Sequence, residues 1–211
     1  MARTVALVVL VVALVGASTA RADGDPASDY LLAASTFIPP DVGIPRAYAD
    51  QLNATVRDAK ARGYTIRVAV IGSRYDMGSV TVLYEKPKQY ARFLGTELLL
   101  IYKQRLLIVM PNGLAVSRSG KASARDQAVV DRIAAPGKDG IALASAATNA
   151  VVRLAADAGV IVPPAPLAAS GRKEPNSTAT GDRITIAGAA VLGVLFIALY
   201  VFLRRRVERS R

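Results

Sequence analysis

Apolar residues in this chain follow helical spacing in some segments and form strand-like runs in others. Residues 45–62 carry one apolar face at helical spacing, which predicts an amphipathic helix that stops before Gly63. Residues 64–71 (YTIRVAVI) are β-branched and aromatic, and their continuous apolar end predicts a strand covered on both faces. The two patterns then repeat, as a predicted helix over 87–102 and a second predicted strand over 105–110 (RLLIVM).

Further elements follow from turn and capping signals. The Asn-Gly pair at 112–113 predicts a tight turn, after which 114–117 pairs back as an edge strand. Ser123 opens a capped helix, and 141–158 is a long alanine-rich helix. Residues 29–38 are a weaker candidate for a first strand. This order predicts an α/β fold, a helix–sheet–helix sandwich with a mixed central sheet.

Two apolar segments at the ends of the chain predict its topology. Residues 1–22 have the short apolar core and small-residue cleavage pattern of a secretory signal peptide. Residues 184–203 are uncharged and long enough for one transmembrane helix, and the arginine-rich segment 204–211 is expected to stay cytoplasmic. The sequence therefore predicts a single-pass protein of the cell membrane, with an extracytoplasmic domain (23–160) and a Pro/Ser/Thr-rich linker (161–183).

Composition narrows the chemistry that this domain can perform. The chain has no cysteine and no histidine, so it lacks thiol nucleophiles, thiolate metal ligands and imidazole bases. Its net charge of +11 is concentrated partly in the signal peptide and the tail. The tail's charge is explained by membrane orientation and by attraction to anionic lipid, so we do not expect nucleic acid as a partner.

The polar residues that follow the two predicted strands form a candidate site. Ligands of open α/β sheets bind beyond the carboxyl ends of strands, where this sequence has Ser73, Arg74 and Asp76 after the first strand and Asn112 after the second. Asp76 and Asn112 supply oxygen ligands of the kind that suits Ca²⁺ or Mg²⁺, with Ser73 and Arg74 as ligand-loop candidates. The alternative is that these are turn residues and that Asp76 caps or solvates its loop.

Three segments resemble the TPM domain family, which is named for a thylakoid lumen protein, a photosystem repair protein and a nematode receptor modulator. They are the strand 64–73 (YTIRVAVIGS), the helix 89–98 (QYARFLGTEL) and the hairpin 105–116 (RLLIVMPNGLAV). The secreted domain and the C-terminal anchor add to the resemblance, which covers about residues 29–158. It implies an α/β domain that helps to assemble or repair a membrane protein complex. Some members of the family are credited with calcium binding or phosphatase activity.

Three functions are compatible with the sequence. The first is a membrane-anchored extracytoplasmic interaction module that assists a protein complex of the cell envelope. The second is a metal-assisted phosphatase of TPM type, which needs clustered carboxylates around Asp76. The third is a receptor for anionic wall polymers, built on a basic cluster around the second helix: Lys86, Lys88, Arg92, Lys103 and Arg105.

Overall fold

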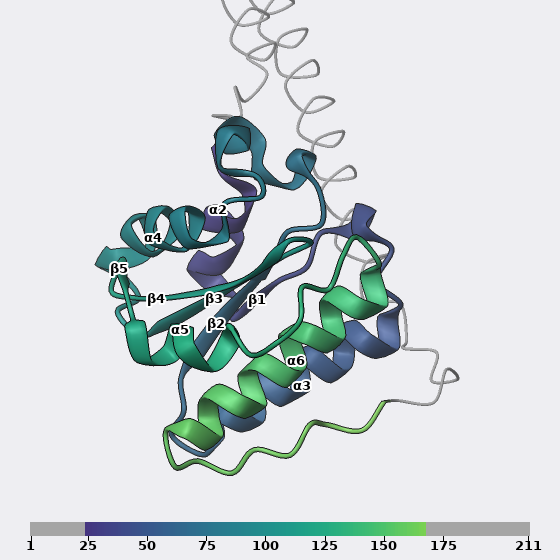
Figure 1. Cartoon of the computed structure of the whole chain (residues 1–211), viewed down its shortest axis with the longest axis vertical. Coiled ribbons are helices and arrows are strands. Elements are labelled where there is room, and N and C mark those ends of the chain that lie inside the picture. Colours follow the sequence, from purple (N-terminus) through teal and green to yellow (C-terminus); the bar gives the residue numbers. More distant parts are fainter. Residues whose placement is uncertain (1–23, 168–211) are drawn as a thin grey trace, which may run out of the picture. The chain divides into compact units, whose positions relative to one another are not determined.

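A computed structural model describes residues 24–167, which form a five-stranded mixed sheet with helices on both faces (Figure 1). The strands lie in chain order: β1 (Thr36–Phe37), β2 (Ile66–Val70), β3 (Arg105–Met110), β4 (Gly113–Arg118) and β5 (Lys121–Ala122). The first three are parallel, whereas β4 and β5 run antiparallel to their neighbours. The predicted α/β class with a mixed sheet is confirmed.

The two central strands are the two that the apolar runs predict. Val68 of β2 lies opposite Leu107 of β3, and Val109 of β3 lies opposite Leu114 of β4. The predicted edge strand 114–117 is not at the edge, because the short strand β5 pairs with the end of β4. Both central strands are covered on both faces, as continuous apolar character requires.

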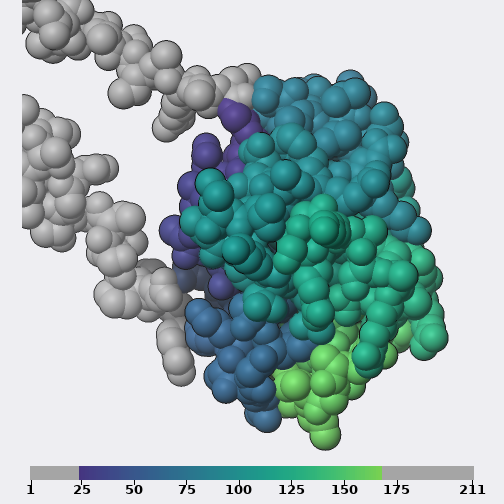
Figure 2. Space-filling view, turned by 90° about the vertical axis from the view of Figure 1, so that its left-hand side faces the viewer, coloured from purple at the N-terminus to yellow at the C-terminus, as the bar shows by residue number. Residues whose placement is uncertain are grey.

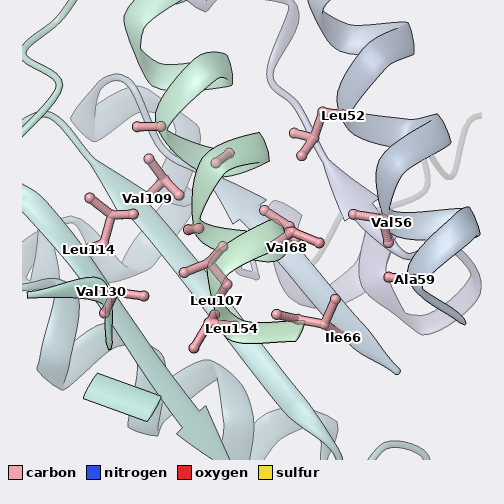
Figure 3. Packing of buried hydrophobic residues seen from close by; sticks show 14 of the residues in the cluster. Leu52, Val56, Ala59, Ile66, Val68, Leu107, Val109, Leu114, Val130 and Leu154 are labelled. Carbon is pink, nitrogen blue, oxygen red and sulfur yellow. The ribbon is translucent and has the colours of Figure 1, made fainter. Parts of the chain in front are cut away.

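Three helices cover one face of the sheet: α3 (Arg46–Ala61), α5 (Ala124–Val130) and α6 (Gly140–Asp157). Their apolar faces meet the strands in a core that Figure 3 shows from close by, with Leu52 and Val56 of α3 beside Val68 and with Leu154 of α6 beside Leu107. The helices predicted over 45–62 and 141–158 are confirmed to within one residue at each end.

The other face is covered by four helical segments: α2 (Pro26–Ala33), the 3₁₀ segment η2 (Arg74–Leu83), α4 (Pro87–Glu97) and the 3₁₀ turn η3 (Leu98–Leu100). A second core lies beneath them and includes Leu31, Met77, Tyr90 and Ile108. The helix predicted over 87–102 therefore ends its α-helical part at Glu97, and the chain tightens into η3 before β3.

The segment before β1 differs from its prediction. Residues 29–38 contain only a two-residue strand, because helix α2 takes up the chain as far as Ala33. Asp25 caps this helix by accepting a hydrogen bond from the Ala27 amide, and Pro26 occupies its first turn. These local signals outweigh the strand-like composition of residues 30–33. A short 3₁₀ turn, η1 (Pro40–Val42), then leads to α3.

After α6 the chain returns along α3. Val162 and Ala165 are buried, and the Ala165 amide donates to Thr55 Oγ1 at 3.0 Å while its carbonyl accepts from Gln51 Nε2 at 2.7 Å. Between residues 24 and 167, no helix has the length and apolar character needed to cross a membrane. The predicted signal peptide, transmembrane helix and basic tail lie outside the described residues.

Candidate functional site

The carboxyl ends of β2 and β3 carry the polar residues that the sequence singles out. Asp76 is buried in η2, and its Oδ2 accepts hydrogen bonds from the amides of Gly72 (2.8 Å) and Ser73 (2.7 Å). The Ser73 side chain accepts in return from the Asp76 backbone, which completes a capping box at the start of η2, and it also accepts from the Tyr75 amide at 3.2 Å. Asp76 therefore fixes the turn that leaves β2.

Asn112 lies in the turn between β3 and β4 and is exposed. Its amide donates to the Glu85 carbonyl at 2.6 Å, and Glu85 has a positive φ of 60° that this bond helps to hold. The neighbouring Tyr84 hydroxyl donates to the Gly72 carbonyl at 3.1 Å. Residues 84–85, which follow η2, are thus bonded through side chains to the loop after β2 and to the turn after β3.

None of these hydrogen bonds joins the predicted ligand residues to one another. Asp76 bonds to its own loop, and Asn112 bonds to the chain ahead of α4, while Arg74 is exposed at the start of η2. Within residues 24–167, no three acidic, histidine or cysteine side chains are grouped as metal ligands would be. The Ca²⁺ or Mg²⁺ site at Asp76 and Asn112 stays a prediction, and the geometry of Asp76 is that of a structural cap.

Loss of the Asp76 carboxylate provides a direct test. Asp76→Ala should lower the free energy of unfolding by about 1–2 kcal/mol, because two backbone amides lose their acceptor. If Asp76 is only a cap, the same decrease is expected in thermal or urea denaturation with and without millimolar Ca²⁺. A stabilisation by Ca²⁺ that the wild type shows and Asp76→Ala lacks would instead establish the ion site.

Another buried carboxylate, Asp25, lies just before the first residue of α2. Both oxygens of Asp25 lie within hydrogen-bond distance of the Tyr90 hydroxyl, at 2.8 and 2.7 Å, and both side chains are buried. Burial raises the pKa of Asp25, although its hydrogen bond from Tyr90 opposes the rise. Burial and the neighbouring Asp25 carboxylate raise the pKa of Tyr90 as well, so the phenol stays protonated and donates.

This pair fastens the first described residues to the domain. The Gly24 carbonyl lies so close to Gly78 that a side chain at Gly78 would collide with it, and Gly78 has a φ of 52°. Residues 24–25 are therefore part of the fold. The local signal for this was present, since Asp followed by Pro is a helix-start pattern, but its partner Tyr90 is 65 residues away.

Apolar side chains are exposed at the opposite edge of the sheet, where the parallel strands begin. Leu100 of η3 is 95% exposed, Ile101 is 54% exposed and Leu32 of α2 is 52% exposed. We call these three residues the amino-edge patch. α2 packs against η3, and Figure 2 shows the purple surface of the first described residues next to teal surface from the middle of the chain.

The side chain of Arg67 contacts the backbone or the neighbours of both parts of this patch, Leu32 on α2 and Ile101 after η3. The Arg67 guanidinium lies 4.2 Å from the centre of the Tyr102 ring, next to Ile101, and it also reaches the Leu32 carbonyl at 3.5 Å. Leu98, the first residue of η3, is fully buried. The patch is therefore a fixed surface supported by a packed core, which lowers the entropy that binding costs.

Comparison with protein-family models, with characterised proteins and with solved structures gave no significant match.

Proposed function

We propose that this protein is a membrane-anchored extracytoplasmic interaction module of TPM type, which assists a protein complex of the cell envelope. The observation that carries the proposal is the amino-edge patch: Leu32, Leu100 and Ile101 are exposed together on a rigid support. Single exposed apolar residues are common on soluble proteins, but adjacent ones on a fixed surface mark sites for partners.

The chemistry of the patch favours a protein partner. Branched aliphatic side chains gain free energy when an apolar surface covers them, at roughly 25 cal/mol per Å² removed from water. Lys103 is exposed two residues after Ile101, and it supplies a charged rim to an apolar centre. An apolar centre with a polar rim is the usual composition of a protein–protein interface.

The basic cluster of the sequence is less suited to a polymer receptor than its spacing suggests. Lys88 pairs with Asp131 at 3.7 Å, and Arg105 pairs with Asp126 at 3.4 Å. Two of the five cations thus face carboxylates of the same domain, which weakens the field that they present to an anionic polymer. This observation favours the interaction module over the polymer receptor.

The proposal predicts a partner contact at position 100. A photo-reactive residue placed at Leu100 in the full chain should form a discrete crosslink to another membrane or envelope protein in intact cells. The same residue at Ile161, which is 82% exposed after α6, serves as the control and should not form that crosslink.

Leu100→Asp then measures the energy of this contact. It should weaken association with the crosslinked protein by about 30-fold, which corresponds to about 2 kcal/mol, because a charge enters an apolar interface. Ile161→Asp should leave association unchanged, and neither substitution should alter thermal stability, since both side chains are exposed. Equal crosslinking at both positions, or unchanged association of Leu100→Asp, would contradict the proposal.

A further inference from the structure

The first and last described residues both lie toward the carboxyl edge of the parallel strands. Gly24 lies against Gly78 of η2, which follows β2. At the other end, Ala165 bonds to Thr55 and Gln51, so the chain runs along α3 toward the start of that helix (Figure 1). Because α3 starts just after β1 ends, its first turn lies at the carboxyl edge.

The loop at this edge exposes apolar side chains on a firm base. Tyr75 is 85% exposed and Val82 is 71% exposed, both on η2. Between them, Asp76 and Met77 are buried and hold the segment to the domain. We call residues 73–86 the η2 loop. Its shape does not depend on a partner, since the capping box and the bond from Tyr84 fix it.

The exposed charges of the η2 loop lie near its two ends. Arg74 and Lys86 are exposed near its two ends, and Glu85 is the exposed acid beside them. With the buried Asp76 counted, the loop has two cations and two anions, but Arg74 and Lys86 are exposed and can face anionic phosphates. Tyrosine with nearby basic residues is typical of positions at the headgroup level of a bilayer.

The tether predicted by the sequence brings a bilayer within reach. Leu167 is the last described residue, and the predicted span starts at Ile184, 17 residues later. For a random-coil linker of 17 residues, the root-mean-square span is about 20–25 Å. Such a short tether gives a high effective concentration of lipid at the domain, so a weak surface contact is enough for docking.

From these observations we infer that the η2 loop docks on the bilayer in which the chain is anchored. Tyr75 and Val82 enter the interfacial region, and Arg74 and Lys86 face the lipid phosphates. The inference rests on the membrane anchor of the proposed function. It orients the domain, because the carboxyl edge then faces the membrane and the amino-edge patch, at the other end of the strands, faces away from it toward a partner.

The chain contains no tryptophan, so a single introduced tryptophan is an unambiguous probe. The full-length Tyr75→Trp variant is reconstituted in vesicles of phosphatidylcholine and phosphatidylglycerol, with and without brominated acyl chains. We expect brominated lipid to remove about half of its fluorescence, as for side chains buried in the headgroup and acyl boundary. The matched control is Leu100→Trp in the amino-edge patch, which should keep its fluorescence.

A second substitution tests the loop without touching the probe. Val82→Asp, added to Tyr75→Trp, places a carboxylate at the proposed lipid contact and should abolish the quenching while the thermal stability stays the same. Quenching that persists in this double variant would overturn the inference.

Other outcomes separate the inference from the proposed function. If Tyr75→Trp is quenched no more than Leu100→Trp although the chain floats with carbonate-washed vesicles, the anchor holds and the docking is refuted. If Tyr75→Trp is shielded from aqueous iodide but not quenched by brominated lipid, protein and not lipid covers the loop, and the inference is refuted. A chain that does not float with the vesicles would refute the anchor, and with it both proposals.

Discussion

Replacing Asp25 with alanine should lower the free energy of unfolding by about 2–4 kcal/mol at mildly acidic pH. The substitution removes the cap of α2, which is worth about 1 kcal/mol, and it leaves the buried Tyr90 hydroxyl without an acceptor, at a further cost of about 1–3 kcal/mol. The Tyr90 hydroxyl lies 2.8 and 2.7 Å from the two carboxylate oxygens of Asp25. Chemical denaturation of the purified protein measures the effect.

The pH dependence of this effect has a defined sign. The pKa of Asp25 is raised in the folded protein above its ordinary value of 3.8, so the folded state binds the proton more tightly than the unfolded state does. The stability that the protonated side chain contributes is therefore fully present below pH 3.8 and is lost as pH rises through the folded-state pKa. Asp25→Ala should accordingly cost more in acid than at neutral pH.

Asp25→Asn is the matched control for this prediction. Asparagine also caps helices, and its carbonyl oxygen still accepts from Tyr90, but it cannot ionise. The stability of the wild type relative to Asp25→Asn should therefore decline as pH rises above 3.8. A difference between the two proteins that stays constant with pH would show that the carboxyl group does not titrate differently on folding.

The sheet and most helices were predictable because their signals are local. The runs VAVI in residues 68–71 and LLIVM in 106–110 are long enough to read as strands buried on both faces, and they became β2 and β3. α3 has one apolar face between a proline and a glycine, and its predicted ends hold. In these segments, the spacing of the apolar residues and the proline or glycine signals at the ends indicate the same structure.

The errors arise where a short element depends on distant contacts. α2 has only eight residues, so its apolar period is hardly repeated, and it is held by Tyr90 and Met77 from later in the chain. η2 is shaped by Asp76 bonding back to the end of β2 and by Gly78 at positive φ. The spacing of residues in the sequence does not predict which distant residues these short elements contact.

The candidate site shows the same limit. Strand-end reasoning places Asp76 and Asn112 at the carboxyl edge, where both are found. It does not reveal that Asp76 is already engaged by two amides or that Asn112 bonds to Glu85. The amino-edge patch was equally hidden, since Leu32 and Leu100 are far apart in sequence and belong to two separate elements.

Removing the Asp126 carboxylate should also destabilise the protein strongly, by about 3 kcal/mol. Asp126 of α5 pairs with Arg105 at the start of β3 over 3.4 Å, and their side chains are only 6% and 16% exposed. Breaking a buried pair by removing one partner leaves an uncompensated charge, which typically costs 3–5 kcal/mol; the residual exposure of Arg105 places this pair at the lower end of that range.

The strand register adds to the cost of Asp126→Ala. Arg105 lies directly opposite Arg118 in the antiparallel pair of β3 and β4, so without Asp126 two like charges face each other across the ladder. If that repulsion contributes, Arg118→Gln introduced into Asp126→Ala should restore part of the lost stability, whereas Arg118→Gln alone should have little effect. Denaturation of the four proteins in a double-mutant cycle measures this coupling.

The Arg125–Asp157 pair is the matched control for burial. Its atoms are closer, at 2.8 Å, but its side chains are 75% and 36% exposed. If burial and not distance determines the cost of losing a charge, Asp157→Ala should cost less than about 1 kcal/mol. Equal costs for Asp126→Ala and Asp157→Ala would contradict this argument. A cost for Asp126→Ala that Arg118→Gln does not reduce would assign the effect to the unpaired Arg105 and to the lost bond from the Ser123 hydroxyl to Asp126.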